Sequence, residues 1–391
     1  MKFKTMKLSE LTVDGRGHYG IGASAVEKSD ELYAYLRITD IYDDGTLNKA
    51  GLKSVDDPDA EKYLLKPNDI VFARTGNSVG KSYFYDERDG SFVYAGFLIK
   101  FSLDPAKVNP RFVKYYCQSQ RYKNWVASFS TGSTRGNINA QTYGDMEILT
   151  PCRAQQDFLV EILSALDDKI ELNRRINANL EQQAFAIFAN LLENACSGEC
   201  RLAEIVEFGP KYTLCKNNVA RCVEMKQLST IGSFPLGWET QTYQGGTRFT
   251  NGDTLLARIT PCLENGKAAY VNFLEEGEIA FGSTEYIVMR SRGVYPAEFF
   301  YCLARNPEFV DYAIKNLNGT SGRQRVSSET LGEYTLPRLS EKEMAIFRNA
   351  VSPSFEKIRN NGLENIALAA VRDALLPRLM SGEIDVDDVK F

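Results

Sequence analysis

The sequence lacks several features that would assign it to a common class of enzyme or membrane protein. It has a single histidine, His18, and no Cys-x-x-Cys pair among its eight cysteines. A catalytic arrangement based on histidine therefore cannot be present in both halves, and the ligand spacing of a structural zinc site is missing. No apolar run approaches the roughly 20 residues that a membrane-spanning helix needs, and the N-terminus has no signal-peptide pattern. We expect a cytoplasmic protein with reduced thiols and no metal site.

Motifs for nucleotide binding and for methyl transfer are also missing. The segment Thr75-Gly-Asn-Ser-Val-Gly80-Lys81-Ser82 is similar to a phosphate-binding loop, but only three residues separate Gly76 from Gly-Lys-Ser, where the motif needs four. Its second copy ends in Gly266-Lys267-Ala268, without the hydroxyl that would bind magnesium. The chain has no glycine-rich Rossmann fingerprint and no Asp/Asn-Pro-Pro-Tyr/Phe segment of adenine methyltransferases. We predict a binding protein without catalytic residues.

One long window of the chain contains no acidic residue. The formal net charge of the whole chain is −5, yet no Asp or Glu occurs from Pro105 to Gly144. Aromatic residues, most of which we expect to face the core, alternate there with the basic residues Lys107, Arg111, Lys114, Arg121, Lys123 and Arg135. Such a composition is found in nucleic-acid-binding surfaces and equally in solvated basic helices, so both alternatives remain open.

The strongest positive feature is an internal repeat. Four landmarks recur in the same order about 185 residues further along the chain. They are Asp69-Ile-Val-Phe-Ala-Arg-Thr75 and Asp253-Thr-Leu-Leu-Ala-Arg-Ile259, Gly80-Lys81 and Gly266-Lys267, Ser133-Thr-Arg135 and Ser321-Gly-Arg323, and Thr142-Tyr-Gly144 and Thr330-Leu-Gly332. A repeat of this length indicates two complete domains, and two similar modules suggest a reader of two similar targets.

A long helical stretch follows each copy of the repeat. From about Arg153 to Leu192 glycine is absent, and a heptad pattern has a positions at Leu159, Leu166, Asn173, Leu180 and Ile187 and d positions at Leu163, Ile170, Asn177, Ala184 and Leu191. This pattern predicts a coiled coil, in which the two asparagines would specify the pairing. A second helical region spans about Ser340 to Met380, and we expect the two helices to pair antiparallel. A long helix packed on a domain is the alternative.

These observations predict the fold class and the domain boundaries. We expect an α/β (α+β) protein with two similar globular domains, residues 1–152 and 197–338, each with short strands and helices. A central long helix, residues 153–196, and a C-terminal long helix, residues 339–391, would separate them as an antiparallel coiled coil.

At this point the sequence resembles the specificity subunit of bacterial type I restriction–modification enzymes. The run Leu375-Leu-Pro-Arg-Leu-Met-Ser-Gly-Glu-Ile-Asp-Val386 is close to the characteristic ending of that family. Pro151 through Leu166 resembles its central helical region, and Ser133-Thr-Arg-Gly-Asn-Ile138 resembles the end of its target-recognition domains. The second repeat departs from this pattern, since it has Ser321-Gly-Arg-Gln-Arg-Val326 instead.

The resemblance implies a non-catalytic subunit that recognises a split, asymmetric sequence in double-stranded DNA, one half per domain. It implies a scaffold for two copies of an adenine methyltransferase (M) subunit and for restriction (R) subunits. AdoMet, ATP and Mg²⁺ are then expected on those partners, and no cofactor on this chain. A scaffold for two protein ligands and a single-chain nuclease or methyltransferase are the alternatives. Binding of specific duplex DNA, or turnover by the isolated chain, would distinguish them.

Candidate DNA-binding residues lie in the recurring polar segments. Arginine suits guanine edges and phosphates, whereas asparagine and glutamine suit adenine. The candidates are Arg74, Asn77, Lys81, Ser133, Arg135, Asn137, Asn139 and Gln141 in the first domain, and Arg258, Asn265, Lys267, Ser321, Arg323, Gln324 and Arg325 in the second. For each one, a phosphate contact or a surface role competes with base readout. Arg74 and Arg258 end strands, so a structural hydrogen bond is a further alternative there.

Overall fold

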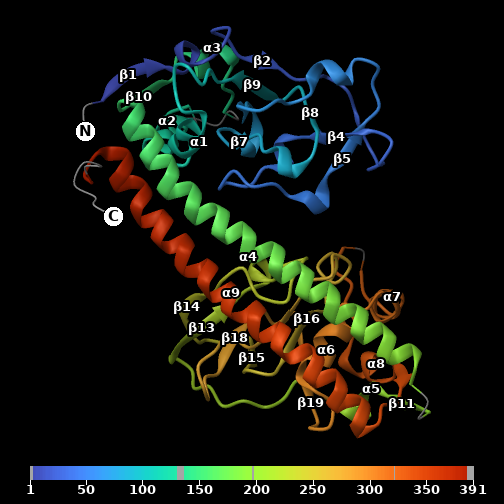
Figure 1. Cartoon of the computed structure of the whole chain (residues 1–391). Helices are drawn as coiled ribbons and strands as arrows, with labels where there is room; N and C mark the ends of the chain where they lie inside the picture. The colour runs from blue at the N-terminus through green and yellow to red at the C-terminus, as the bar shows by residue number, and fades with distance from the viewer. Residues whose placement is uncertain (1–2, 130–135, 196–197, 321, 385–391) are drawn as a thin grey trace. The chain divides into compact units, whose positions relative to one another are not determined.

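The computed structural model describes residues 3–129, 136–195, 198–320 and 322–384 (Figure 1). The chain divides into two compact units, unit 1 with Met1–Leu166 and Ala370–Phe391, and unit 2 with Asp167–Ala369. Each unit therefore contains part of both long helices. The domain boundaries given above stay predictions. Within the described ranges, no helix is both long enough and apolar enough to cross a membrane.

The described residues of unit 1 form two four-stranded sheets and one separate strand pair. The first sheet is antiparallel, with the order β2 (His18–Tyr19), β9 (Leu98–Ser102), β6 (Asp69–Ala73) and β7 (Ser82–Phe84). The second sheet has the order β3 (Ala25–Val26), β5 (Lys53–Val55), β4 (Tyr33–Leu36) and β8 (Phe92–Tyr94), in which β4 and β8 are parallel. The strand pair consists of β1 (Lys4–Lys7) and β10 (Glu147–Thr150).

Three short α-helices lie in the described part of this domain, namely α1 (Pro110–Tyr116), α2 (Gln120–Ala127) and α3 (Ala140–Gly144), and short 3-10 helices lie between its strands. The Asn109 side chain caps the start of α1, where proline occupies the first helical position and needs no hydrogen-bond partner. The aromatic side chains of the acid-free window pack into the core against β6, as predicted. Four of them are almost completely buried: Phe112, Tyr115, Tyr116 and Tyr122.

Unit 2 has the same set of sheets. Its antiparallel sheet has the order β12 (Val206–Phe208), β19 (Tyr286–Ser291), β16 (Thr254–Ala257) and β17 (Ala268–Tyr270). Its second sheet has the order β14 (Glu239–Thr242), β13 (Val219–Val223), β18 (Ala280–Gly282) and β15 (Thr247–Phe249), with β13 and β18 parallel. The other described elements are the pair β11 (Glu199–Arg201) and β20 (Thr335–Pro337), the α-helices α5 (Leu202–Ile205), α6 (Ala297–Ala304), α7 (Pro307–Lys315) and α8 (Ser328–Gly332), and the 3-10 helix η7 (Met225–Gln227).

The sequence repeat is thus a repeat of structure. Asp69 and Asp253 begin the equivalent strands, and each buried carboxylate accepts a backbone N–H from three residues earlier, at 2.8 Å in both copies. In the second sheet, β5, β4 and β8 of unit 1 correspond to β14, β13 and β18 of unit 2. The fourth strands do not correspond, because β3 pairs with β5 at one edge and β15 pairs with β18 at the other edge. The shared strands form a common scaffold, and the added edge strands make the two domains different.

The long helices α4 (Arg153–Glu193) and α9 (Glu341–Ser381) pair antiparallel (Figure 1). In unit 1, Leu159 and Leu163 near the start of α4 share a core with Leu376 and Leu379 near the end of α9. In unit 2, Phe188 near the end of α4 contacts Phe347 near the start of α9, with ring centroids 6.3 Å apart. The predicted α/β class and the predicted pairing of two long helices are confirmed.

The heptad pattern holds along most of α4 and fails near its end. Ile187, predicted at an a position, is 36% exposed, whereas the next residue, Phe188, is 2% exposed. A straight α-helix has 3.6 residues per turn, so its buried stripe drifts away from a strict 3.5-residue repeat. The prediction for Ile187 was wrong for this reason.

The predicted seam asparagines form a polar cluster with α9 in unit 2. The Asn173 amide donates to Glu364 Oε2 (2.7 Å) and to Asn365 Oδ1 (2.9 Å). The Asn361 amide donates to Asn177 Oδ1 (2.8 Å). Asn173 and Asn361 are each 1% exposed, whereas the acceptor Glu364 is partly exposed, so these hydrogen bonds are partly shielded from water. Polar side chains buried in this way favour one register of the two helices.

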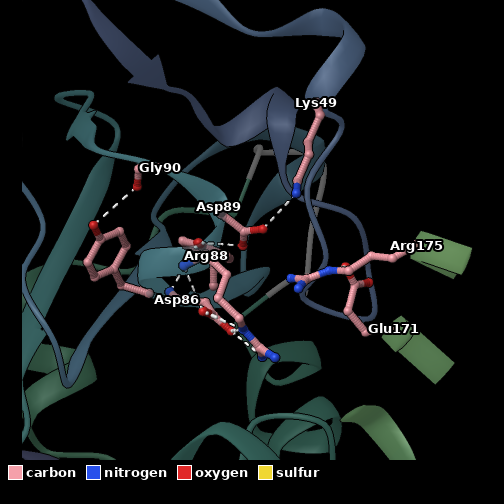
Figure 2. A network of polar contacts seen from close by, with 9 residues as sticks. Lys49, Asp86, Arg88, Asp89, Gly90, Glu171 and Arg175 are labelled. Atoms are coloured by element: carbon pink, nitrogen blue, oxygen red, sulfur yellow. Dashed lines mark hydrogen bonds and ion pairs between the residues drawn. The ribbon is translucent and has the colours of Figure 1, made fainter. Parts of the chain in front are cut away.

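Acidic residues in the connection between β7 and β8 of unit 1 are paired locally (Figure 2). Asp86 accepts from Arg88 Nε (2.9 Å), and this hydrogen bond lowers the pKa of the Asp86 carboxyl. Asp89 lies 2.8 Å from Lys49 Nζ and accepts from the Tyr83 hydroxyl (2.9 Å). These carboxylates therefore stabilise the connection itself.

Candidate nucleic-acid interface

The recurring arginine of each unit lies where three chain segments meet. Arg74 follows β6, its N–H donates to the carbonyl of Phe97 (3.0 Å), and its carbonyl accepts from Ile138 N–H (2.9 Å). The end of a strand, the turn between β8 and β9, and the loop before α3 are thus joined at one residue. Two polar segments that the sequence separates by about 60 residues are brought together here.

Unit 2 has the same junction. Arg258 follows β16, its N–H donates to the carbonyl of Glu285 (3.0 Å), and its carbonyl accepts from Val326 N–H (3.0 Å). The next residues also correspond, because Thr75 forms a bridge with Asn137 and Ile259 forms one with Arg325. We call the two arrangements the arginine junctions of unit 1 and unit 2.

The side chains of both junction arginines lack a hydrogen-bond partner within the described part of the chain. Arg74 Nε and Arg258 Nε are buried atoms without a partner there. The Arg74 guanidinium lies over the Tyr19 ring, 4.9 Å from its centroid, and the Tyr19 hydroxyl accepts from Ala140 N–H (3.1 Å). The structural hydrogen bonds considered as an alternative for these arginines are therefore not seen. A buried donor without an acceptor is costly, so these side chains are not explained by folding alone, and both residues are only half-buried.

The loop residues of unit 1 differ in whether their side chains already form hydrogen bonds within the protein. Asn137 is exposed, and its side chain makes no hydrogen bond to any described residue. Asn139 Oδ1 accepts from Thr142 N–H (2.8 Å) and caps α3, whereas Gln141 donates to Asp145 Oδ2 (2.7 Å). Ser133 and Arg135 lie outside the described residues. DNA contact by this set stays a prediction, with Asn137 the side chain most available for it.

The loop of unit 2 carries a charged group at the matching place. Arg325 is exposed, and its guanidinium donates to the carboxylate of Glu285 at 2.6 to 3.1 Å. These hydrogen bonds lower the pKa of the Glu285 carboxyl, to which Arg258 also contributes electrostatically. Arg323 is exposed and Gln324 half-buried, and the N–H of Gln324 donates to Thr260 Oγ1 (3.1 Å). Ser321 lies outside the described residues.

The two recurring lysines have a visible structural role. Lys81 Nζ donates to the Ile41 carbonyl (3.2 Å) and lies 3.1 Å from Asp43 Oδ1. Lys267 Nζ donates to the Met225 carbonyl (2.8 Å). Each lysine thereby ties its β-hairpin to a loop beside the second sheet, and for both residues DNA contact stays a prediction.

The hairpin turns before these lysines explain the recurring glycines. Gly80 and Gly266 have φ of +84° and +68°, a backbone conformation that glycine adopts readily. The segment that is similar to a phosphate-binding loop lies between two strands, β6 and β7, whereas that motif requires a strand followed by a helix. Asn77 and Asn265 are exposed in these turns.

Some residues of the junctions were missed by sequence reasoning. Tyr19, Phe97 and Glu285 belong to segments outside the recurring motifs. Only the tertiary structure places Tyr19 and Phe97 beside Arg74, and Glu285 beside Arg325. Phe97 is 60% exposed, which is unusual for phenylalanine at a turn. In unit 1, Tyr19, Asn139 and Gln141 also line a shallow hollow of about 470 Å³ together with Arg16. Among the residues described, no cluster of His, Cys, Asp and Glu could hold a metal ion.

Comparison with known proteins identifies the class of domain. Residues 3–182 match the family model described as the type I restriction modification DNA specificity domain. The HindI specificity subunit of Haemophilus influenzae is 23% identical, over 84% of this chain and 89% of that protein. The MjaIX specificity subunit of Methanocaldococcus jannaschii is 23% identical, over 71% of this chain and 70% of that protein.

A solved structure shares the fold of the whole chain. The crystal structure of the type I restriction-modification S subunit from M. genitalium covers 97% of this chain and 96% of its own, with a TM-score of 0.54 and 18% identity. Residues 3–182 belong to the type I restriction modification DNA specificity domain family, and the chain is similar over most of its length to type I restriction enzyme specificity subunits. This family is non-catalytic, so the prediction that the chain is not an enzyme is confirmed on that ground.

Proposed function

We propose that this chain directs a type I restriction–modification complex to an asymmetric, bipartite DNA site, of which each unit reads one half. The observation that carries the proposal is the duplicated arginine junction. Arg74 and Arg258 follow equivalent strands, are bonded to equivalent turns and loops, and each has a buried Nε without a partner within the described residues. Two equivalent sites with different surrounding side chains fit two different half-sites.

The chemistry of the junctions suits DNA. Guanidinium groups donate to phosphate oxygens and to the O6 and N7 atoms of guanine, and an exposed asparagine such as Asn137 suits adenine. The peptide groups of Arg74 and Arg258 are hydrogen-bonded on both sides, so their side chains start from a fixed backbone. A fixed backbone lowers the conformational entropy that is lost on binding.

The partners of this chain would be the M and R subunits of the complex, with two copies of M. Relatives named as specificity subunits of the HindI and MjaIX restriction enzymes support this assignment. In such a complex, AdoMet, ATP and Mg²⁺ would be bound by the partners, and this chain would supply DNA recognition and a scaffold.

Methylation mapping tests the proposal. Adenine methylation is sequenced genome-wide in cells that express the chain together with its neighbouring methyltransferase subunit, and in cells from which only this chain is deleted. We expect a bipartite methylated motif that disappears on deletion. A folded, assembled complex that methylates no motif would contradict the proposal and favour a scaffold for protein ligands.

A further inference from the structure

The duplication allows residues of the two junctions to be matched by their backbone contacts alone. Phe97 and Glu285 are equivalent, because the carbonyl of each accepts the N–H of a junction arginine. Asn137 and Arg325 are equivalent, because each forms a bridge with the residue that follows this arginine. The backbone is the same in the two units, whereas the side chains at these two places have entirely different chemistry.

In unit 2 these two places hold an ion pair of defined geometry. Glu285 accepts from Arg325 Nε (2.9 Å) and from Arg325 Nη2 (2.6 Å), so both carboxylate oxygens contact one edge of the guanidinium. Arg325 Nη1 donates to the carbonyl of Arg323 (3.2 Å). Of the five N–H groups of an arginine side chain, one on each Nη is then left for another acceptor. The Arg325 side chain is 42% exposed, so such an acceptor can approach from solvent.

The backbone around this pair is held on both sides. Arg325 N–H donates to the Asn318 carbonyl (2.9 Å), and Asn318 N–H donates to the Arg325 carbonyl (3.0 Å). Glu285 N–H donates to Ser283 Oγ (3.1 Å). Arg325 is therefore positioned before any ligand binds, which reduces the entropy cost of holding a long side chain in one geometry.

We infer that Arg325, oriented by Glu285, is the residue of unit 2 that reads a guanine in the major groove. The inference rests on the proposed function. The two remaining N–H groups, one on each terminal nitrogen, match the O6 and N7 acceptors on the edge of guanine. Unit 1 has Asn137 and the apolar Phe97 at the same places, so it lacks this fork and reads its half-site by other contacts.

The charge of the junction is consistent with this role. Glu285 lies near two arginines, Arg258 and Arg325, so the three side chains together carry one positive charge. A partly exposed ion pair by itself contributes little to stability, so folding alone does not explain why Glu285 holds Arg325 along one edge. Because Glu285 occupies the edge with Nε and Nη2, the edge formed by the two terminal nitrogens stays available for the ligand.

The test uses the full chain with its methyltransferase subunits and starts from the motif of the wild-type protein. If the wild type neither methylates nor binds a specific DNA site, the proposed function itself has failed, and the role of Arg325 fails with it. Given a motif, binding is measured for DNA duplexes with each base pair of both half-sites replaced in turn, at several salt concentrations. The variants are Arg325→Lys, Arg325→Ala and Glu285→Gln. The control is Arg338→Ala, since Arg338 forms an exposed ion pair with Glu204 (2.7 Å) outside the junction.

Arg325→Lys keeps the positive charge and loses the two parallel N–H donors of the guanidinium group. It therefore distinguishes base readout from a phosphate contact. We expect it to lose roughly ten- to hundredfold discrimination at one G·C pair of one half-site, with little change in the salt dependence of binding. Arg325→Ala should lose the same discrimination, Glu285→Gln should lose part of it, and Arg338→Ala should lose none.

Three results overturn the inference. One is unchanged discrimination in both Arg325 variants. Another is that Arg325→Ala weakens the binding of all duplexes equally. The slope of the logarithm of the binding constant against the logarithm of the salt concentration would then be smaller by about one, as expected for the loss of a phosphate contact. The third is a loss of discrimination at an A·T pair. The thermal melting of each variant is measured alongside, and Arg325→Lys serves as the readout if Arg325→Ala does not fold.

Discussion

At the level of single residues, Arg74 and Arg258 differ from the recurring lysines in having no side-chain hydrogen bond to a described residue. Both arginines follow a buried strand, where a structural hydrogen bond is the ordinary expectation. Neither side chain has such a bond within the described residues, whereas the neighbouring Lys81 and Lys267 do. Sequence alone could not distinguish these two kinds of recurring cation, because the difference depends on carbonyl groups brought close only by folding.

This contrast gives a prediction about stability. Arg74→Ala and Arg258→Ala should each change the free energy of unfolding by less than about 1 kcal/mol, because no described hydrogen bond is lost. Lys81→Ala and Lys267→Ala should each cost about 1–3 kcal/mol, because a charge-assisted hydrogen bond to a carbonyl is removed. Denaturant unfolding of the four variants measures this. Equal losses for the arginine and lysine variants would mean that the arginines are structural.

The buried acid Glu181 of α4 gives a second prediction. Its carboxylate accepts from the Tyr301 hydroxyl (2.7 Å) in the core of unit 2, and burial raises the pKa of the Glu181 carboxyl above its ordinary value of 4.5. Between the ordinary and the raised pKa, the folded protein binds more protons than the unfolded chain. The free energy of unfolding contributed by this group therefore falls as the pH rises through this range.

Glu181→Gln removes the titration and keeps an oxygen for the Tyr301 hydroxyl. Its stability relative to the wild type should increase as the pH rises above about 4.5 and then level off. Tyr301→Phe should cost about 1–3 kcal/mol, because the carboxylate loses its donor. Unfolding curves over a series of pH values measure both. A difference between Glu181→Gln and the wild type that does not change with pH would contradict the raised pKa.

At the level of elements, the sequence predicted what depends on local periodicity and on repetition. The long helices, their pairing and the seam asparagines follow from spacing alone. The heptad pattern predicted that Ile187 is buried, but Phe188 is buried instead. The reason is that the position of the buried face along α4 depends on helix geometry and on the domain against which α4 packs. Strand order could not be predicted, because pairs such as β4 with β8 join segments far apart in the chain.

The asparagine cluster gives a prediction for the helix pair. A double-mutant cycle of Asn177→Ala and Asn361→Ala should give a coupling energy of about 0.5–3 kcal/mol, because their side chains share a partly buried hydrogen bond. Glu171 and Arg175, an exposed pair on α4 with Nε and Oε1 3.1 Å apart (Figure 2), provide the control. Their coupling should be about 0.3–0.5 kcal/mol. An asparagine coupling no larger than this would mean that the cluster does not specify the register.

At the level of the whole molecule, the two helices connect the two proposed readers. α4 enters unit 2 after Leu166, and α9 returns to unit 1 after Ala369. A heptad of seven residues adds about 10 Å of helix, which corresponds to about three base pairs of DNA. The sequence suggested this organisation through its repeat. It could not indicate that Glu285 and Arg325 meet at one junction while Phe97 and Asn137 occupy the other.

Insertion of one heptad after Leu166 together with one after Ala369 should lengthen the spacer between the two half-sites by about three base pairs. The half-sites themselves should not change, because neither junction is altered. Methylation mapping of the double insertion measures this, and insertion into α4 alone serves as the control, which should lose the helix register and the activity. An unchanged spacer in an active double insertion would contradict the role of the helices in setting this distance.

The most direct test of the central claim compares the methylated motifs of the wild type, Arg74→Ala and Arg258→Ala, each expressed with the same methyltransferase subunit. If each arginine junction reads one half-site, the two variants should relax or lose base preference in different halves of the motif, and the other half should be kept. Both variants altering the same half, or neither altering any position, would contradict the account.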